Sequence, residues 1–149
     1  MPAATPPTPA PEANPAPPSP PMGIIPGIKA GDADNLLAFH LDLAREVVRQ
    51  RPTSPRALML AGNLLTIDGQ TGAAVDMDRQ LVAADPANPV ASYNLACSLA
   101  QAAHPEAALD ALEHALDLGF SDRGLFAQDH DLDPLRQLPR FHHLSTRLR

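Results

Sequence analysis

The chain of 149 residues is poor in cysteine, in lysine and in long apolar runs. Cys97 is the only cysteine, so no disulfide can form within the chain, and a reducing cytoplasm is the expected compartment. Lys29 is the only lysine and the net charge is −6. This argues against a nucleic-acid partner, because neutralising phosphates takes clustered lysine and arginine. No stretch approaches the ~20 apolar residues of a membrane span, and the first residues lack the positive charge and apolar run of a secretory signal. We therefore expect no membrane partner.

The composition divides the chain into three parts. Residues 1–22 contain ten prolines and almost no large apolar side chain, which predicts a disordered, partly polyproline-II tail. Residues 23–33 are interpreted as a linker. Residues 34–149 remain for a single domain with one modest core.

An internal repeat is the strongest signal in that domain. Shifting the chain by 34 residues superposes equivalent residues. These are Pro52 and Pro86, Pro55 and Pro89, Ala57 and Ala91, Gly62 and Ala96, Leu65 and Leu99, and Ala74 and Ala108. In the second copy Asn88 is a good helix cap, Pro89 suits a first helical position and Gly119 suits a left-handed C-cap. Ser54 and Pro55 repeat the cap and proline, so we predict helical hairpins over about 55–88 and 89–122.

These residues resemble the tetratricopeptide repeat (TPR) family, whose unit is a 34-residue helix–turn–helix. The matching positions are Leu58, Gly62, Leu65, Ala74 and Pro86, then Leu95, Ala96, Leu99, Ala108, Leu112 and Ala115. The first copy departs from the pattern at Ala61, Asp78 and Leu81, and Met77 is expected to pack beside Leu81. The second copy departs from it at Phe120, where the family has proline. The resemblance implies an all-α fold, a short right-handed superhelix of hairpins with an N-terminal helix and a C-terminal cap.

The cap is expected in residues 123–149. Asp129, Asp131, Leu132, Pro134, Leu135, Arg136, Pro139, Arg140 and Phe141 resemble the terminal segment of the TPR subset called end-of-group. We predict a short helix around Phe126 and a last helix from Pro139, which seal the core with Leu135, Phe141, Leu144 and Leu148. Residues 104–133 hold eight acids against one base, and residues 134–149 hold four arginines and no acid. A basic end helix beside an acidic neighbour is therefore expected, with Asp131 or Asp133 capping the turn before Leu135.

The resemblance also implies a concave face lined by the first helix of each hairpin. The candidate groove residues are Arg56, Met59, Asn63, Tyr93, Asn94 and Gln101. Asn63 and Asn94 stand where chaperone-binding TPR domains place two peptide-clamping asparagines, whose amides pair with both N–H and C=O groups. The cations of those clamps are missing, since Met59 replaces the lysine, so capture of a C-terminal carboxylate is not expected.

The leading hypothesis is a non-catalytic protein-interaction module, a TPR scaffold, adaptor or chaperone-like protein. It would bind a peptide segment or partner helix in the groove. We expect no catalytic residue, cofactor or metal ligand. Cys97 lies in mid-helix without a nearby base, and neither a catalytic triad nor a nucleotide loop is present.

Two alternatives stay open. The helix predicted from Leu36 to Gln50 has an apolar face wider than one packing surface needs. Either Ile24, Ile25 and Ile28 cover it, or a second copy does, which makes the protein a homodimer through residues 36–48 with a proline-rich tether. His40 in this face is expected to be partly buried.

The second alternative is a metal-dependent enzyme. It would use Asp129, His130 and Asp131 with the pair His142 and His143. A calcium loop starting at Asp129 would need glycine and glutamate where Pro134 and Arg140 stand, and adjacent histidines point to different sides of a helix.

Overall fold

The computed structural model describes the backbone of residues 30–148 and the side chains of residues 34–148. This part contains seven α-helices and one 3-10 helix, and no strand lies within it. In chain order they are α1 (Ala30–Gln50), α2 (Pro55–Ile67), α3 (Thr71–Ala84), α4 (Pro89–Gln101), α5 (Pro105–Asp117), α6 (Arg123–Gln128), η1 (His130–Leu135) and α7 (Pro139–Ser145). The all-α class is confirmed for this part. The predicted tail, residues 1–22, and Ile24, Ile25 and Ile28 lie outside the described residues.

Local sequence signals explain where these helices begin. Helices α2, α4, α5 and α7 each have proline in the first turn, where a missing N–H leaves no hydrogen bond unmade. The Asn88 side chain accepts hydrogen bonds from the N–H groups of Val90 and Ala91, so its predicted cap is confirmed. The equivalent cap is wrong at Ser54, whose side chain makes no such bond.

The helices α2, α4 and α5 end in the same left-handed turn. The residues with positive φ are Gly69 at 75°, Ala103 at 60° and Gly119 at 95°. Two backbone hydrogen bonds close the turn each time, as at Gly119, whose N–H donates to Leu116 while the next N–H donates to Ala115. The C-cap predicted at Gly119 is confirmed. Ala103 adopts a conformation that only glycine reaches without strain.

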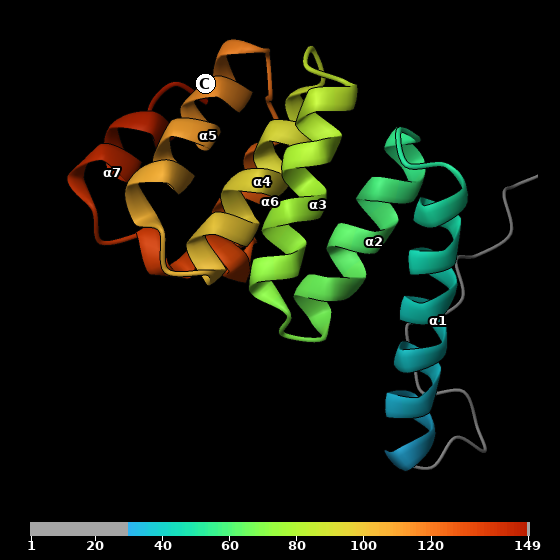
Figure 1. Ribbon diagram of the computed structural model, residues 1–149. Coiled ribbons are helices and arrows are strands. Elements are labelled where there is room, and N and C mark those ends of the chain that lie inside the picture. The colour runs from blue at the N-terminus through green and yellow to red at the C-terminus, as the bar shows by residue number, and fades with distance from the viewer. Residues whose placement is uncertain (1–29, 149) are drawn as a thin grey trace, which may run out of the picture.

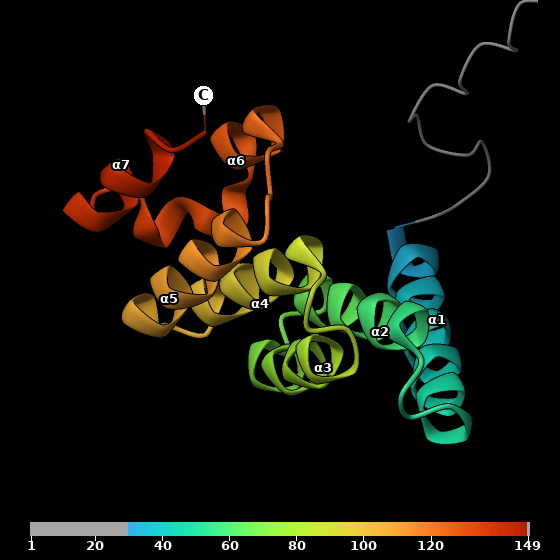
Figure 2. The ribbon, with the colours of Figure 1, turned by 90° about the horizontal axis from the view of Figure 1, so that it is seen from above.

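Helices α1 to α5 succeed one another from one end of the molecule toward the other (Figures 1 and 2). Helix α1 stands at one end and packs on α2, and each of α2, α3 and α4 packs on the helix that follows it. At the other end η1 packs on α4, and α7 packs on α5. The C-terminal segment therefore covers the last hairpin. None of the helices between residues 30 and 148 combines the length and apolar character that crossing a membrane requires.

The largest part of the core lies among α4, α5 and the C-terminal segment. Leu135, Phe141, Leu144 and Leu148 are all buried there, as predicted for the cap. The rings of Phe126 and Phe141 stack with their centroids 5.0 Å apart. Two smaller clusters, built on Leu41, Leu65 and Ala74 and on Leu58, Leu81 and Ala91, join α1 to α4, and Met77 packs against both.

Charge complementarity fixes the last helix. The Arg140 guanidinium lies 2.7 Å from Asp110, 2.7 Å from Glu113 and 3.5 Å from Glu106, all on α5. Arg147 adds an ion pair to Glu113 at 3.7 Å. The expected pairing of a basic end helix with an acidic neighbour is confirmed.

One side of α1 carries exposed apolar side chains. Leu36 is 46% exposed, Phe39 62%, Leu43 50% and Val47 37%. His40 is exposed as well, so the expectation that it is partly buried is wrong. Among the described side chains of α1, Leu41 and Ala44 are buried, and Leu41 packs with Leu65 of α2 and Ala74 of α3.

Candidate functional site

A cavity of about 340 Å³ lies where α2, α3 and α4 meet the segment around η1. We call it the central cavity. Its lining residues are Asn63, Thr66, Ile67, Asp78, Tyr93, Asn94, Cys97, Ser98, Leu125, Asp129 and Asp131. Eight of these residues lie on α2, α3 and α4, and all but Asp78 lie on α2 or α4. Helices α2 and α4 are the first helices of the two predicted hairpins. The cavity therefore lies on the face that the sequence indicates for the groove.

Asp78 of α3 is a buried acid in this lining. It is 1% exposed, and its Oδ2 accepts a hydrogen bond from the Ser98 hydroxyl. Its Oδ1 is buried without a hydrogen-bond partner among the described residues. Burial raises the pKa of the Asp78 carboxyl from 3.8 to about 6, against the lowering effect of the Ser98 hydrogen bond.

A glycine makes room for this carboxyl. A Cβ atom placed on Gly62 of α2 would lie 2.5 Å from Asp78 Oδ1, which is closer than any normal contact. The position of the Asp78 carboxyl therefore requires glycine at residue 62.

Asp129 lines a second wall of the cavity, from the C-terminal segment. Its Oδ2 accepts a 2.8 Å hydrogen bond from the Tyr93 hydroxyl, and its Oδ1 accepts a 2.9 Å hydrogen bond from the Asp131 N–H. The second bond caps η1, so the expectation that Asp131 or Asp133 provides this cap is wrong. The Tyr93 ring stacks on Phe120 with centroids 4.3 Å apart, which fixes the hydroxyl toward Asp129.

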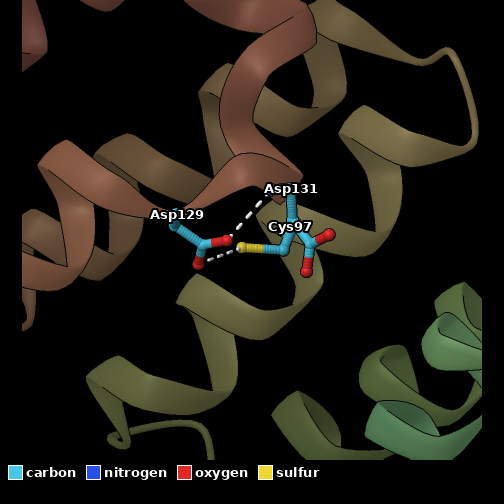
Figure 3. Close-up of side chains that lie close together, drawn as sticks. All are labelled: Cys97, Asp129 and Asp131. Atoms are coloured by element: carbon cyan, nitrogen blue, oxygen red, sulfur yellow. Dashed lines mark hydrogen bonds between the residues drawn. The ribbon is translucent and has the colours of Figure 1, made fainter.

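Cys97 lies beside the two acids of this wall (Figure 3). Its Sγ donates to Asp129 Oδ2 at 3.7 Å, and one ligand atom from each of Cys97, Asp129 and Asp131 lies within 4.8 Å of the others. Burial, followed by the negative charges of Asp129 and Asp131, raises the pKa of the Cys97 thiol. The thiol is therefore protonated near neutral pH, which removes its value as a nucleophile. A metal ion would have to displace this proton and the hydrogen bonds that both Asp129 oxygens already accept.

The cavity carries a negative charge without a matching positive one. Asp78, Asp129 and Asp131 line it, and none of its eleven lining residues is lysine, arginine or histidine. The pKa of Asp131 is raised by burial and then by the charges of Asp129 and Asp133, although His130 acts in the opposite direction. The contribution of Asp129 and Asp133, unlike that of burial, reports a negative potential, which favours a cation in the cavity.

The structure brings together three of the six predicted groove residues. Asn63, Tyr93 and Asn94 line the central cavity, although Tyr93 is only 2% exposed. Gln101 lies further along α4, where its amide donates a 2.9 Å hydrogen bond to the backbone oxygen of Asp131. Arg56 is exposed and Met59 packs on the cluster of Leu58, and neither lines the cavity.

Sequence reasoning missed Asp78 and Ser98 as site residues. The signal in the sequence was the combination of an acid, Asp78, at a core position of the second helix of the hairpin with a glycine, Gly62, in the first helix. Asp129 and Asp131 were considered as metal ligands and as part of the end-of-group segment, but not as part of the groove. No protein-family model matches the chain, and no curated protein matches it either.

Proposed function

We propose that the chain is a non-catalytic protein-interaction module of the tetratricopeptide repeat type. Its central cavity would hold a peptide segment or partner helix. The repeat of elements supports this reading. Helices α2 and α4 are both 13 residues long and begin at Pro55 and Pro89, and α3 and α5 begin at Thr71 and Pro105, so both pairs are 34 residues apart. Hairpins stacked with this period form a superhelix whose first helices line the inner face.

The observation that carries the proposal is the amide-lined cavity on that face. Asn63 is exposed and Asn94 is half-buried, so both amides are open to a ligand. An amide both donates and accepts hydrogen bonds, which suits the alternating N–H and C=O groups of a peptide backbone. Exposed Ile67, at 71%, and Leu125, at 45%, add apolar contact area to the same cavity.

The chemistry of the lining supports a binding role without catalysis. The Cys97 thiol is buried and protonated, and burial also raises the pKa of the Tyr93 hydroxyl. The pKa of Asp78 is about 6, but this side chain is 1% exposed and accepts the hydrogen bond of Ser98. These groups are poorly placed to exchange a proton with a substrate.

Peptide selection tests this function. We would select peptides of about nine residues from a displayed library on the intact protein, then measure their dissociation constants by fluorescence anisotropy. The double variant Asn63→Ala and Asn94→Ala should weaken binding tenfold or more, because each lost hydrogen bond is worth about 1 kcal/mol. Asn35→Ala, an exposed asparagine on α1, is the matched control and should bind like the wild type. Failure to select any peptide, or equal affinity for both variants, would contradict the proposal.

A second function has its own observation in the exposed apolar side of α1. Self-association through residues 36–48 would bury Leu36, Phe39, Leu43 and Val47 against a second copy. Light scattering should then show a dimer at tens of micromolar protein, which Phe39→Glu converts to a monomer. Val90→Glu, which alters an exposed apolar residue on α4, should leave the dimer intact. A monomeric wild type at that concentration would exclude this function.

A further inference from the structure

We propose that the central cavity receives the cationic side chain of an arginine or lysine from the bound segment, with arginine the better fit. The inference rests on the proposed function and names the chemistry of its ligand. It follows from the charge, the hydrogen-bond acceptors and the apolar rim of the cavity.

The first argument is the uncompensated charge. Three carboxylates line the cavity and no basic residue does. The Arg136 guanidinium is already engaged, because it donates to Asp133 Oδ1 at 2.7 Å and to the backbone oxygen of Asp129 at 2.8 Å. Burial, and then the charges of Asp129 and Asp133, raise the pKa of the half-buried Asp131 carboxyl, so an entering cation relieves a repulsion between these carboxylates.

The second argument comes from Asp78. This side chain is 1% exposed, lines the same cavity and has one carboxylate oxygen without a hydrogen-bond partner among the described residues. A buried acceptor without a donor costs free energy in the empty protein. The Ser98 hydroxyl gives its hydrogen to Asp78 Oδ2, so it does not satisfy Oδ1 as well.

The third argument is the distribution of polar and apolar groups. Ile67 and Leu125 are the most exposed apolar residues of the lining. The methylene stem of an arginine or lysine packs on such residues while its head reaches polar groups. A guanidinium presents five N–H donors in a plane, which match the two oxygens of the Asp131 carboxylate better than a lysine ammonium does.

The experiment compares arginine with citrulline, which has nearly the same shape and no charge. Peptides selected from the displayed library should share a basic residue, and replacing it by citrulline should weaken binding tenfold or more. Asp131→Asn should cause a loss of similar size. Asp76→Asn, which removes an equal charge from an exposed position on α3, should change the affinity less than twofold.

An independent probe separates this inference from the proposed function. N-acetylarginine amide, added to the isotope-labelled protein, should shift the backbone amide resonances of Asn63, Cys97 and Asp131, and N-acetylcitrulline amide should not. Peptides that bind in the cavity equally well with citrulline would overturn the cation inference and leave the interaction module standing. Shifts from the arginine probe without any selected peptide would keep the cation site and overturn the module. Stoichiometric zinc binding that Cys97→Ser abolishes would assign the cavity to a metal instead and overturn the inference.

Discussion

Asp78 should make the protein lose stability as the pH rises from mildly acidic to neutral. The pKa of its carboxyl is about 6 in the folded protein, whereas it is 3.8 when the group is not perturbed. Between these two pH values the native state holds a proton that the unfolded chain has released. The free energy of unfolding therefore falls by about 1.4 kcal/mol per pH unit in this interval. A shift of about two units corresponds to a total loss of about 3 kcal/mol, which is complete above the folded-state pKa.

The variant Asp78→Asn isolates this contribution, because asparagine does not titrate. Unfolding by urea, followed by helical circular dichroism, would give the free energy of unfolding from about pH 3.5 to about pH 7.5. From the lowest to the highest pH, the free energy of unfolding of the variant should rise by about 3 kcal/mol relative to that of the wild type. This change does not depend on the difference between the two proteins at the lowest pH. Asp76→Asn, at an exposed position on the same helix, should show a nearly constant difference. A constant difference for Asp78→Asn as well would refute the assignment of a raised pKa to this buried acid.

Three further predictions concern single side chains. Gly62→Ala should lower the free energy of unfolding by about 1 to 3 kcal/mol, because its Cβ would lie 2.5 Å from Asp78 Oδ1. Gly72→Ala changes a helical glycine with no atom within 4 Å of the added Cβ, so it should raise the free energy of unfolding by about 0.5 kcal/mol. Equal effects of Gly62→Ala and Gly72→Ala in urea unfolding would contradict this prediction. Ala103→Gly should raise the free energy of unfolding by about 1 kcal/mol, since φ is 60° there, and an unchanged urea midpoint would argue against strain. Tyr93→Phe keeps the stacked ring and loses the hydrogen bond to a carboxylate, so the same assay should show a loss of about 1 to 2 kcal/mol, which full wild-type stability would disprove.

The hairpins could be predicted because their signals are local and repeated. Proline in the first turn, caps and left-handed turns act within a few residues, so Asn88, Pro89 and Gly119 reveal the helix ends without knowledge of the fold. The start of α1 was placed too late. Helix α1 begins at Ala30, whereas the apolar pattern that predicted the helix starts at Leu36.

The cavity could be predicted only in part, because its key contacts are distant in sequence. Asp129 meets Tyr93 and Cys97 across 36 and 32 residues, and Asp78 meets Ser98 across 20. No periodic pattern encodes these pairings, since those of Asp129 depend on how the C-terminal segment folds onto α4 and that of Asp78 on how α3 packs on α4. The asparagines were predicted as site residues because they follow the repeat. Asp78 was missed because it departs from the repeat pattern, and Asp129 and Asp131 were not placed in the groove because they lie outside the repeats.

A crystal structure of the protein with the tightest selected peptide tests the central claim most directly. The account predicts that the peptide lies over the central cavity, with its backbone against Asn63 and Asn94 and a basic side chain within hydrogen-bond distance of Asp131. A peptide seated on the exposed apolar side of α1, with the central cavity empty, would contradict it.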